Sequence, residues 1–441
     1  MLLSGWGRFP RADCRVLRPA NAAAVPDVLA GQGAAIARGM GRSYGDSALN
    51  PAAVIDMRGL SRLLAFDPET GLLEAEAGVV LGDIIAVFLP RGWFPPVTPG
   101  TRFVTLGGMI AADVHGKNHH GAGSIGSHIA WLDLLGADGE VRRCSPTENA
   151  ELFTLTIGGM GLTGMILRCA LRLMPVASGW IRQTQIAAPD LDAALAVFEA
   201  NMASPYSVAW IDCLATGKAL GRSLITLGDH AAPDDLPAER RAQPFAVPAR
   251  RRLSVPIDAP GWALNGISVK AFNALYHARG LSALGERLVS WDSYFYPLDA
   301  VLHWNRIYGR QGFAQFQCVL PLATSRAGLQ ALLEAISAAG TGSFLAVLKR
   351  MGPQESALSF PMEGYTLALD FPARARPLAL LERLDRIVLD HGGRFYLAKD
   401  SRMKADVLHA SDPRAAAFRE RREALGLVRH FSSLQSERLG L

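Results

Sequence analysis

The chain has 441 residues, of which 49% are hydrophobic and 19% charged, and its formal net charge is +5. This length predicts two or three domains, and the composition excludes a disordered protein. The modest positive charge, without a zinc-finger, helix-turn-helix or RNP pattern, argues against nucleic-acid binding and suits an anionic surface or a phosphate. The five cysteines are dispersed and form no CxxC pair, which argues against a disulfide framework and a thiolate metal site.

Neither a signal peptide nor a membrane span is expected. The N-terminal stretch MLLSGWGRFPRADCRVLRP lacks a charged start followed by a long apolar core. The apolar stretch IIAVFLPRGWFPP is interrupted at Pro90 and Arg91 before it reaches the length of a span. We therefore expect a cytoplasmic protein or one bound peripherally at the inner membrane, and its periplasmic face stays open as an alternative.

Residues 15–180 alternate short apolar runs with glycine turns. VIDM and LLEAEAGV are typical of strands, ADG of a hairpin turn, and ANAAAVPDVLAG and LGDIIAVFLPRG of helices that stop at glycine. After Met174 the elements lengthen: LDAALAVFEANM predicts a helix and YSVAWIDCLA a strand.

The segment 229–262 carries six prolines and the run Arg250-Arg251-Arg252. Proline at this density predicts a long loop without regular elements. Two interpretations stay open, a surface insertion or a basic loop that lies on a phosphate-bearing membrane.

The following part predicts a sheet covered by helices. FAQFQCVLP (313–321) alternates strictly, so Gln315 and Gln317 share one face of a strand. FLAVLKRMG and GYTLALDFP predict two more strands, and SRAGLQALLEAISAAG and LALLERLDRIVLDHGG predict helices. The fold class is therefore α+β, with helices packed on one face of the sheet.

Three glycine-rich turns in the first part carry the candidate chemistry. ARGMGRSYGDS (37–47) follows an expected strand, and such a turn lets consecutive N–H groups point at an anion. Small residues dominate TPGTRFVTLGGMIAADVHGKNHH (98–120) and IGGMGLTGMI (157–166), so a cofactor is able to lie against the backbone. A Rossmann site is rejected, because GQGAAI (31–36) follows a helix and precedes a strand.

Together these turns resemble the vanillyl-alcohol-oxidase (PCMH) type of FAD-binding domain, in which two small subdomains bury an extended flavin. The motifs GWGR, ARGMGRSYGD, HGKNHH, GLTG, FxQxQ, SFP, LDFP and AKDSR occur in this order. That series is similar to the decaprenylphosphoryl-β-D-ribose 2'-oxidase family. The resemblance implies an FAD-binding domain over 1–178, to which 394–441 return. It also implies a substrate-binding domain over 179–393 that contains the loop 229–262 and an antiparallel sheet covered by helices.

The resemblance also implies non-covalent FAD and a set of cofactor contacts. These are Ala37, Arg38, Gly39, Met40, Gly41, Arg42, Ser43, Tyr44, Gly45, Asp46, Ser47, Gly100, Thr105, Leu106, Gly107, Gly108, Ala112, Asp113, Val114, His115, Ile166, Tyr396 and Lys399.

The histidines of DVHGKNHHGAGSIGSH raise the question of a metal. His115 and His119 have i,i+4 spacing, but the surrounding glycines disfavour a helix and no further ligand set is apparent, so we expect no metal. His119, His120 and His128 have a structural alternative, hydrogen bonding within the loop. His115 aligns with the position at which many superfamily members attach FAD covalently, and the resemblance implies a catalytic contact without a bond.

On the substrate side, the resemblance places Lys399 at the flavin ring as the second catalytic residue. Its ammonium would stabilise charge on the reduced flavin, or its amine would help to deprotonate a sugar hydroxyl. The sugar-phosphate pocket would be formed by Tyr44, Trp210, Gln315, Gln317 and Lys349. One departure is the stretch Thr366-Leu367-Ala368-Leu369-Asp370, where mycobacterial members have Asn-x-Cys, which leaves the exact sugar or lipid open.

The implied activity is FAD-dependent oxidation of the ribose 2'-hydroxyl of a polyprenylphosphoryl-β-D-ribose, the first half of epimerisation to an arabinose donor. An NAD(P)-dependent keto-reductase, a quinone or other organic electron acceptor and a peripheral membrane contact would be its partners. Two alternatives stay open, a soluble sugar or aldonolactone oxidase and a catalytically silent flavoprotein subunit.

Overall fold

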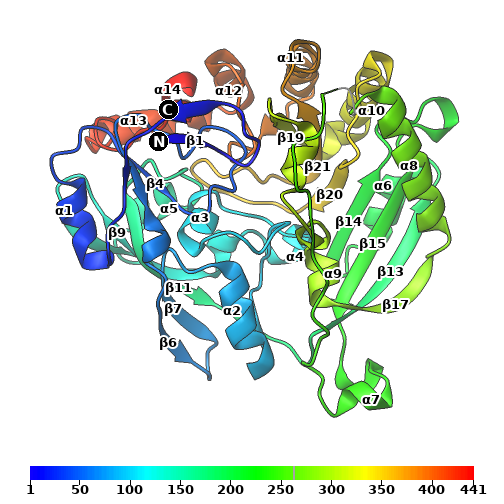
Figure 1. Cartoon of the computed structure of the whole chain (residues 1–441), viewed down its shortest axis with the longest axis horizontal. Helices are drawn as coiled ribbons and strands as arrows, with labels where there is room; N and C mark the ends of the chain where they lie inside the picture. The colour runs from blue at the N-terminus through cyan, green and yellow to red at the C-terminus, as the bar shows by residue number, and fades with distance from the viewer. Residues whose placement is uncertain (262–263) are drawn as a thin grey trace.

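A computed structural model describes residues 1–261 and 264–441 of the chain (Figure 1). The strands form parallel and antiparallel sheets. A parallel sheet has the order β3 (Val16–Leu17), β5 (Val54–Asp56), β4 (Ile36–Arg38). An antiparallel sheet has the order β10 (Val141–Cys144), β9 (Ile129–Leu135), β11 (Met165–Arg172), β7 (Leu72–Glu76), β6 (Leu63–Asp67). The largest sheet, with eight antiparallel strands, has the order β17 (Gly285–Ser290), β13 (Trp180–Ala188), β15 (Ser223–His230), β14 (Tyr206–Ile211), β20 (Val347–Met351), β21 (Gly364–Pro372), β19 (Phe313–Pro321), β22 (Arg394–Phe395). Short pairs join β1 (Leu2–Ser4) to β2 (Arg11–Asp13), β8 (Trp93–Phe94) to β12 (Met174–Pro175), and β16 (Leu253–Ser254) to β18 (Val301–Leu302).

The helices fall into three groups along the chain, which is therefore α+β. The first group is α1 (Val25–Leu29), α2 (Leu81–Phe88), α3 (Leu106–Ala111), α4 (His119–Ala122) and α5 (Ala150–Thr156). The second is α6 (Leu191–Ala200), α7 (Ala238–Arg241), α8 (Gly266–Leu281), α9 (Trp291–Phe295), α10 (Leu322–Ala339) and α11 (Ala375–Asp390). The last is α12 (Ala405–Ser411), α13 (Arg414–Ala424) and α14 (Leu434–Leu439).

The two faces of the eight-stranded sheet differ in chemistry. Strands β19 and β21 pair with Gln315 opposite Asp370 and Gln317 opposite Ala368, so polar side chains share one face. The alternate residues, among them Phe316 and Leu369, are buried, and helices α6, α10 and α11 contact these strands and their neighbours. The period-two pattern thus directs the amide side chains away from the helical layer.

The last helices lie against the first part of the chain, so that red and blue ribbons overlap on the left in Figure 1. Arg438 in α14 donates to both carboxylate oxygens of Asp46, at 2.7 and 3.1 Å, and to Asp400 at 2.8 Å. Ala35 forms a parallel bridge with Phe431. A charged network and a backbone bridge therefore join residues nearly 400 positions apart in sequence.

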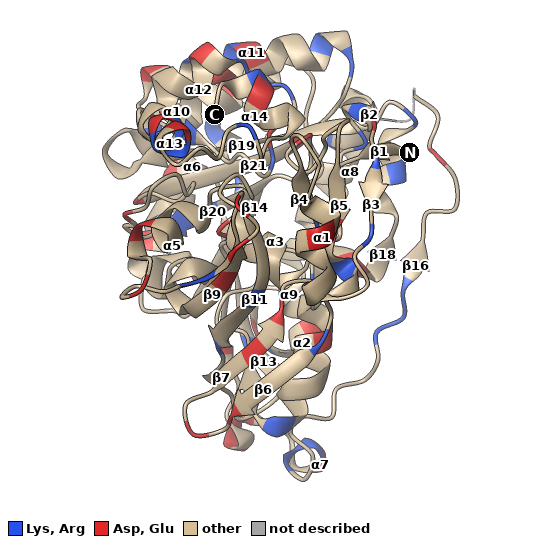
Figure 2. Cartoon of the chain, turned by 90° about the vertical axis from the view of Figure 1, so that its left-hand side faces the viewer, with Lys and Arg blue, Asp and Glu red and all other residues tan. Residues whose placement is uncertain are grey.

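The proline-rich segment runs along the edge of the molecule towards β16 (Figure 2). The prediction that it holds no regular element is wrong at four places, one of which is a short 3-10 helix over Pro233–Asp235. Strand β15 extends into it as far as His230, the short helix α7 forms between two prolines, and β16 pairs with β18. Proline is accommodated because Pro237 precedes the first turn of α7 and needs no helical N–H there.

None of the helices among residues 1–261 and 264–441 is both long enough and apolar enough to cross a bilayer.

Candidate active site

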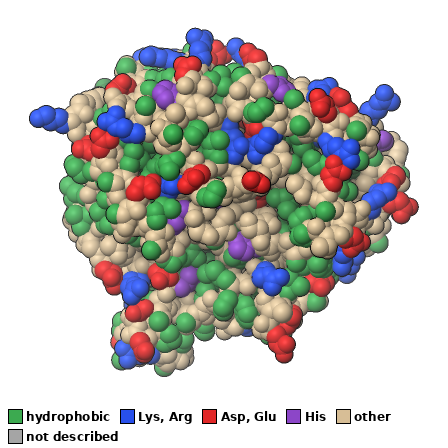
Figure 3. Space-filling model, turned by 180° about the vertical axis from the view of Figure 1, so that it is seen from behind, with side chains coloured by type: hydrophobic (Ala, Val, Ile, Leu, Met, Phe, Trp, Pro, Cys, Tyr) green, Lys and Arg blue, Asp and Glu red, His purple; other side chains and the backbone are tan. Residues whose placement is uncertain are grey.

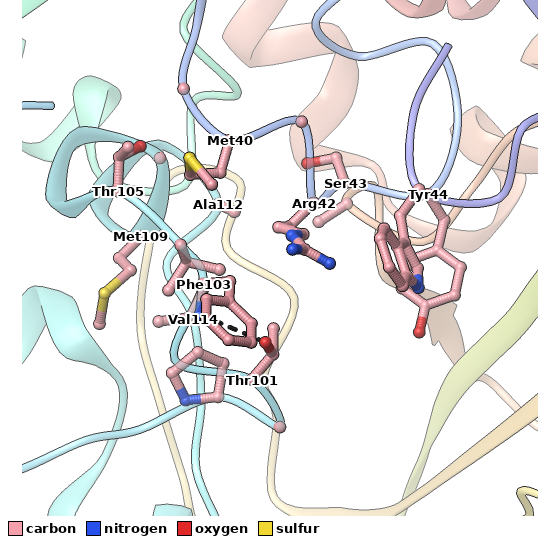
Figure 4. Close-up of a pocket in the computed structure, with 18 of the residues that line it drawn as sticks. Met40, Arg42, Ser43, Tyr44, Thr101, Phe103, Thr105, Met109, Ala112 and Val114 are labelled. Atoms are coloured by element: carbon pink, nitrogen blue, oxygen red, sulfur yellow. Dashed lines mark hydrogen bonds between the residues drawn. The ribbon is translucent and has the colours of Figure 1, made fainter. Parts of the chain in front are cut away.

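A cavity of about 400 Å³ lies between the glycine-rich turns and the polar face of the eight-stranded sheet. The first part of the chain supplies most of the predicted cofactor contacts to its wall, and Figure 4 shows several of them together. These lining residues are Ala37, Gly39, Met40, Gly41, Arg42, Ser43, Tyr44, Ser47, Gly100, Thr105, Gly107, Gly108, Ala112, Val114, His115 and Ile166. From the sheet and the segment after β22, the wall gains Gln315, Gln317, Val347, Lys349, Ala368, Tyr396, Ala398 and Lys399.

The turn after β4 is shaped by close packing of backbone. A Cβ on Gly39 would lie 2.0 Å from Thr105 Oγ1, and Gly41 has a φ of +63°. Neither position tolerates a side chain without movement of the wall. The small residues of this turn line the same cavity as Met109 and Val114, which gives it the room and the apolar surface that a large flat ligand needs.

Five predicted cofactor contacts lie behind this wall instead of lining it. Arg38 donates to the carbonyls of Ser4 and Ala48, and Gly45 packs against Asp400. Asp46 pairs with Arg438, and Leu106 is fully buried in the core. Asp113 accepts hydrogen bonds from Ser124 Oγ and the Gly126 amide. They support the wall from behind.

The four histidines have separate roles. His119 Nε2 lies 2.8 Å from Gln354 Oε1, His120 Nε2 lies 2.8 Å from the Ser204 carbonyl, and His128 Nε2 lies 2.9 Å from the Ala122 carbonyl. The glycines limit the helix here to the single turn of α4. Over the described residues, no group of three or more His, Cys, Asp or Glu side chains is arranged to hold a metal ion.

His115 differs from the other three because its ring lines the cavity. Its Nε2 lies 3.2 Å from the Gln317 amide nitrogen, whereas its buried Nδ1 has no hydrogen-bond partner in the structure. Burial, followed by the nearby Lys349, lowers the pKa of His115 well below its usual value, so the ring is neutral at pH 7. The rings of Tyr396 and Phe360 pack beside it, with centroids at 5.1 and 5.5 Å. An unpaired buried nitrogen at a cavity wall fits a bound ligand that supplies its partner.

Lys399 reaches the cavity from the segment after β22. Its Nζ lies 4.0 Å from the centroid of the Tyr44 ring. Burial lowers the pKa of Lys399 below that of an ordinary lysine, and Lys349 adds to this effect while Asp370 opposes it. The neutral amine is therefore within reach near neutral pH, as a proton acceptor requires.

Asp370 is a site residue that its motif alone did not reveal. Gln315 Nε2 donates to Asp370 Oδ1 at 2.6 Å, and the buried Oδ2 has no hydrogen-bond partner in the structure. Burial raises the pKa of this carboxyl, against the opposing effects of Gln315 and Lys399. The signal in the sequence was the alternation in GYTLALDFP, which puts Thr366, Ala368 and Asp370 on one face.

Lys349 and Gln317 form the polar floor of the cavity. Burial lowers the pKa of Lys349 to about 8, so it stays mostly cationic at pH 7. Gln317 donates to Thr366 Oγ1 at 3.2 Å, so this threonine gives the amide a hydrogen-bond partner. Ala368 also lines the cavity and contributes only a methyl group to it.

Three aromatic side chains also line the cavity, together with the guanidinium of Arg42. Of these residues, the sequence predicted only Arg42. The Arg42 guanidinium lies 4.0 Å from the Trp6 ring centroid and 5.3 Å from that of Phe103. Thr101 Oγ1 accepts from the Phe103 amide, shown as a dashed line in Figure 4. Trp304 completes this part of the wall. No pattern in the sequence linked these separate segments.

Trp210, which we predicted to close the pocket, is not among the residues that line the cavity. Its register places it on the cavity face, opposite Val347, but β20 and β21 separate its strand from β19. There the indole packs on Tyr276 of α8 at 4.8 Å and donates to the Phe344 carbonyl at 3.2 Å. Helix α8 therefore covers this tryptophan, and the cavity ends before it.

Comparisons with known proteins agree with the geometry. Residues 15–145 match the FAD binding domain family, so the chain carries an FAD-binding domain and FAD is its cofactor. The chain is 37% identical to decaprenylphosphoryl-beta-D-ribose oxidase of Mycolicibacterium smegmatis, over 100% of this chain and 97% of that protein. It is 31% identical to L-gulonolactone oxidase of Mus musculus over only 31% of each chain, and 29% identical to human Delta(24)-sterol reductase over 27% of this chain and 23% of the reductase.

Proposed function

The chain belongs to the decaprenylphosphoryl-β-D-ribose oxidase family and is an FAD-dependent oxidoreductase, and we propose that it oxidises the ribose 2'-hydroxyl of a polyprenylphosphoryl-β-D-ribose to the 2-keto sugar. One observation carries the proposal: Lys399, Lys349, Gln315, Gln317 and the neutral His115 line the same cavity as the glycine-rich turns. A polar floor opposite an apolar wall suits a sugar phosphate beside a flat ring.

We also propose that the chain is divided into two domains. Residues 1–178, with 394–441, would hold FAD in a two-subdomain PCMH-type domain, and residues 179–393 would bind the substrate. The contacts of Arg438 with Asp46 and Asp400, and the position of Gln315 and Lys349 on the eight-stranded sheet, support this division.

Residues of this chain would perform the proton chemistry. Bound FAD supplies the acceptor for the hydride that leaves the sugar C2 carbon. Lys399, as the neutral amine, takes the proton of the C2 hydroxyl, and the adjacent Asp370 carboxyl stabilises the resulting ammonium. Lys349 binds the anionic part of the substrate, and Gln315 and Gln317 orient the sugar hydroxyls. The unpaired Nδ1 of His115 would bind the cofactor through a hydrogen bond and without a covalent bond.

Flavin reduction tests the proposed substrate. Under anaerobic conditions, a detergent-solubilised polyprenylphosphoryl ribose should bleach the flavin absorbance, whereas free ribose and aldonolactones should not. If the lipid-linked sugar does not bleach the flavin absorbance, the proposal is refuted. Acid precipitation should release the yellow cofactor into the supernatant, and flavin retained in the pellet would contradict non-covalent binding.

The reaction requires further partners, which we include in the proposal. The keto sugar would pass to an NAD(P)-dependent keto-reductase that completes epimerisation, and a quinone or other organic acceptor would reoxidise the flavin. The similarity to L-gulonolactone oxidase covers only about a third of the chain, so it supports the shared cofactor and not a shared substrate.

A further inference from the structure

Helix α8 exposes a stripe of apolar side chains, whereas its Asn273 is buried. Ile267 and Leu275 are 82% and 71% exposed, and Leu281 is 45% exposed. Ala271, Ala274 and Ala278 are exposed between them, at the three- and four-residue spacing of one helix stripe. On the opposite face Asn273 is buried and donates to Asp212 Oδ1 at 2.7 Å. This is the reverse of an ordinary surface helix, whose outer face is polar.

The charged residues of α8 itself have one sign. Residues 259–285 contain no aspartate or glutamate, and Lys270 and Arg279 flank the stripe on its two sides. Both cationic side chains are exposed. The face of the molecule seen in Figure 3 differs, because cations and anions are interspersed there. An apolar stripe with cationic edges is complementary to a bilayer whose headgroups are anionic.

A series of ring contacts joins this helix to the cavity. Phe272 of α8 lies 5.5 Å from Phe344, which stacks on Tyr308 at 5.7 Å. Tyr308 stacks on Phe313 at 4.3 Å, and Phe313 contacts the cavity residue Tyr44 at 5.4 Å. The helix is thus fixed to the same rigid aromatic cluster that forms part of the cavity wall.

From these observations we infer that α8 is an interfacial helix that docks the enzyme on an anionic phospholipid surface. Ile267, Leu275 and Leu281 enter the acyl boundary, while Lys270 and Arg279 contact headgroup phosphates. This inference rests on the proposed function, because a polyprenyl-linked substrate resides in a membrane. Docking through α8 holds the cavity beside that membrane, so the sugar phosphate enters while its lipid stays in the bilayer.

Vesicle flotation of the full-length FAD-bound protein tests the inference. The wild type should float with phosphatidylglycerol-containing vesicles and not with pure phosphatidylcholine vesicles. The double variant Ile267→Asp/Leu275→Asp should lose at least about tenfold in partitioning, because two buried aliphatic side chains are removed from the interface. Lys270→Gln/Arg279→Gln should weaken binding to the anionic vesicles alone. Leu425→Asp is the matched control, since Leu425 is 40% exposed just beyond α13, on the opposite side in Figure 1, and its partitioning should stay at the wild-type level.

Three outcomes would overturn the inference. The wild type does not bind anionic vesicles, or the α8 double variant binds them as well as the wild type. In the third, the wild type is a dimer and the α8 double variant is a monomer. Sizing by light scattering detects the dimer, and retained flavin absorbance verifies folding of each variant. Flavin reduction by detergent-solubilised substrate requires no vesicle. A failure of docking is therefore distinguishable from a failure of the proposed function.

Discussion

Replacing Lys399 with methionine removes the ammonium group and keeps an unbranched side chain of similar length in the cavity wall. Two estimates of the effect agree. A positioned general base contributes about 10²–10⁴ in rate, or about 3–5 kcal/mol. A cation about 4 Å from developing negative charge contributes about 4 kcal/mol at an effective dielectric constant of 20. We therefore expect flavin reduction by the lipid-linked ribose to slow by about 10²–10⁴.

Arginine separates the two roles, because a guanidinium keeps the positive charge and does not give up its proton in a protein. If Lys399 is the base, Lys399→Arg should be nearly as slow as Lys399→Met. If it acts only by charge, the arginine variant should retain much of the rate. Lys404→Met is the control, since Lys404 is a 65% exposed lysine paired with Glu382.

Anaerobic stopped-flow absorbance at the flavin band measures the reduction rate directly, without the reoxidation step. The flavin spectrum before mixing verifies that each variant holds its cofactor. A Lys399→Met protein that loads flavin and reduces it within about threefold of the wild-type rate would refute the catalytic role, because general bases contribute far more than that.

Three further predictions follow from the cavity. Because its pKa is lowered, Lys399 gains its neutral form as pH rises, so the reduction rate should increase through a midpoint below the ordinary lysine value of about 10.4; a rate that falls over that range would contradict the assignment. Gly39→Ala should cost about 1–3 kcal/mol in unfolding free energy and weaken flavin binding, because its Cβ would lie 2.0 Å from Thr105 Oγ1, whereas Gly33→Ala meets no atom within 4 Å; thermal melts with flavin fluorescence compare the two. The wild type should resist thiol-directed electrophiles because its five cysteines are buried, and Ala368→Cys should make flavin reduction sensitive to them; equal inactivation of both proteins would place the reactive thiol elsewhere.

Elements with strong periodicity were predictable from the sequence. The alternation in 313–321 and 364–372 gives both strand bounds as they occur, because burying one face of a strand requires every second residue to be apolar. The glycine-rich turns were predictable for a different reason, since only small residues allow backbone segments to approach as closely as Gly39 and Thr105 do.

Long-range packing accounts for what the sequence did not reveal. Trp210 has the register of a cavity residue, yet whether it lines the cavity depends on α8, which lies more than fifty residues later in the chain. The aromatic wall formed by Trp6, Phe103 and Trp304 joins three distant segments with no common motif. Alternation along a strand identifies which residues share a face of the sheet. Which element covers that face depends on tertiary packing.

The contacts of α14 with Asp46 and Asp400 have a consequence for biosynthesis. The glycine-rich turns are translated long before Tyr396 and Lys399, which line the cavity, and before Arg438, which contacts Asp46 and Asp400. We therefore expect the cofactor to bind only after α14 has been synthesised and has packed against Asp46 and Asp400. A stop codon placed just before α14 should yield a chain that keeps every glycine-rich turn and still binds flavin poorly.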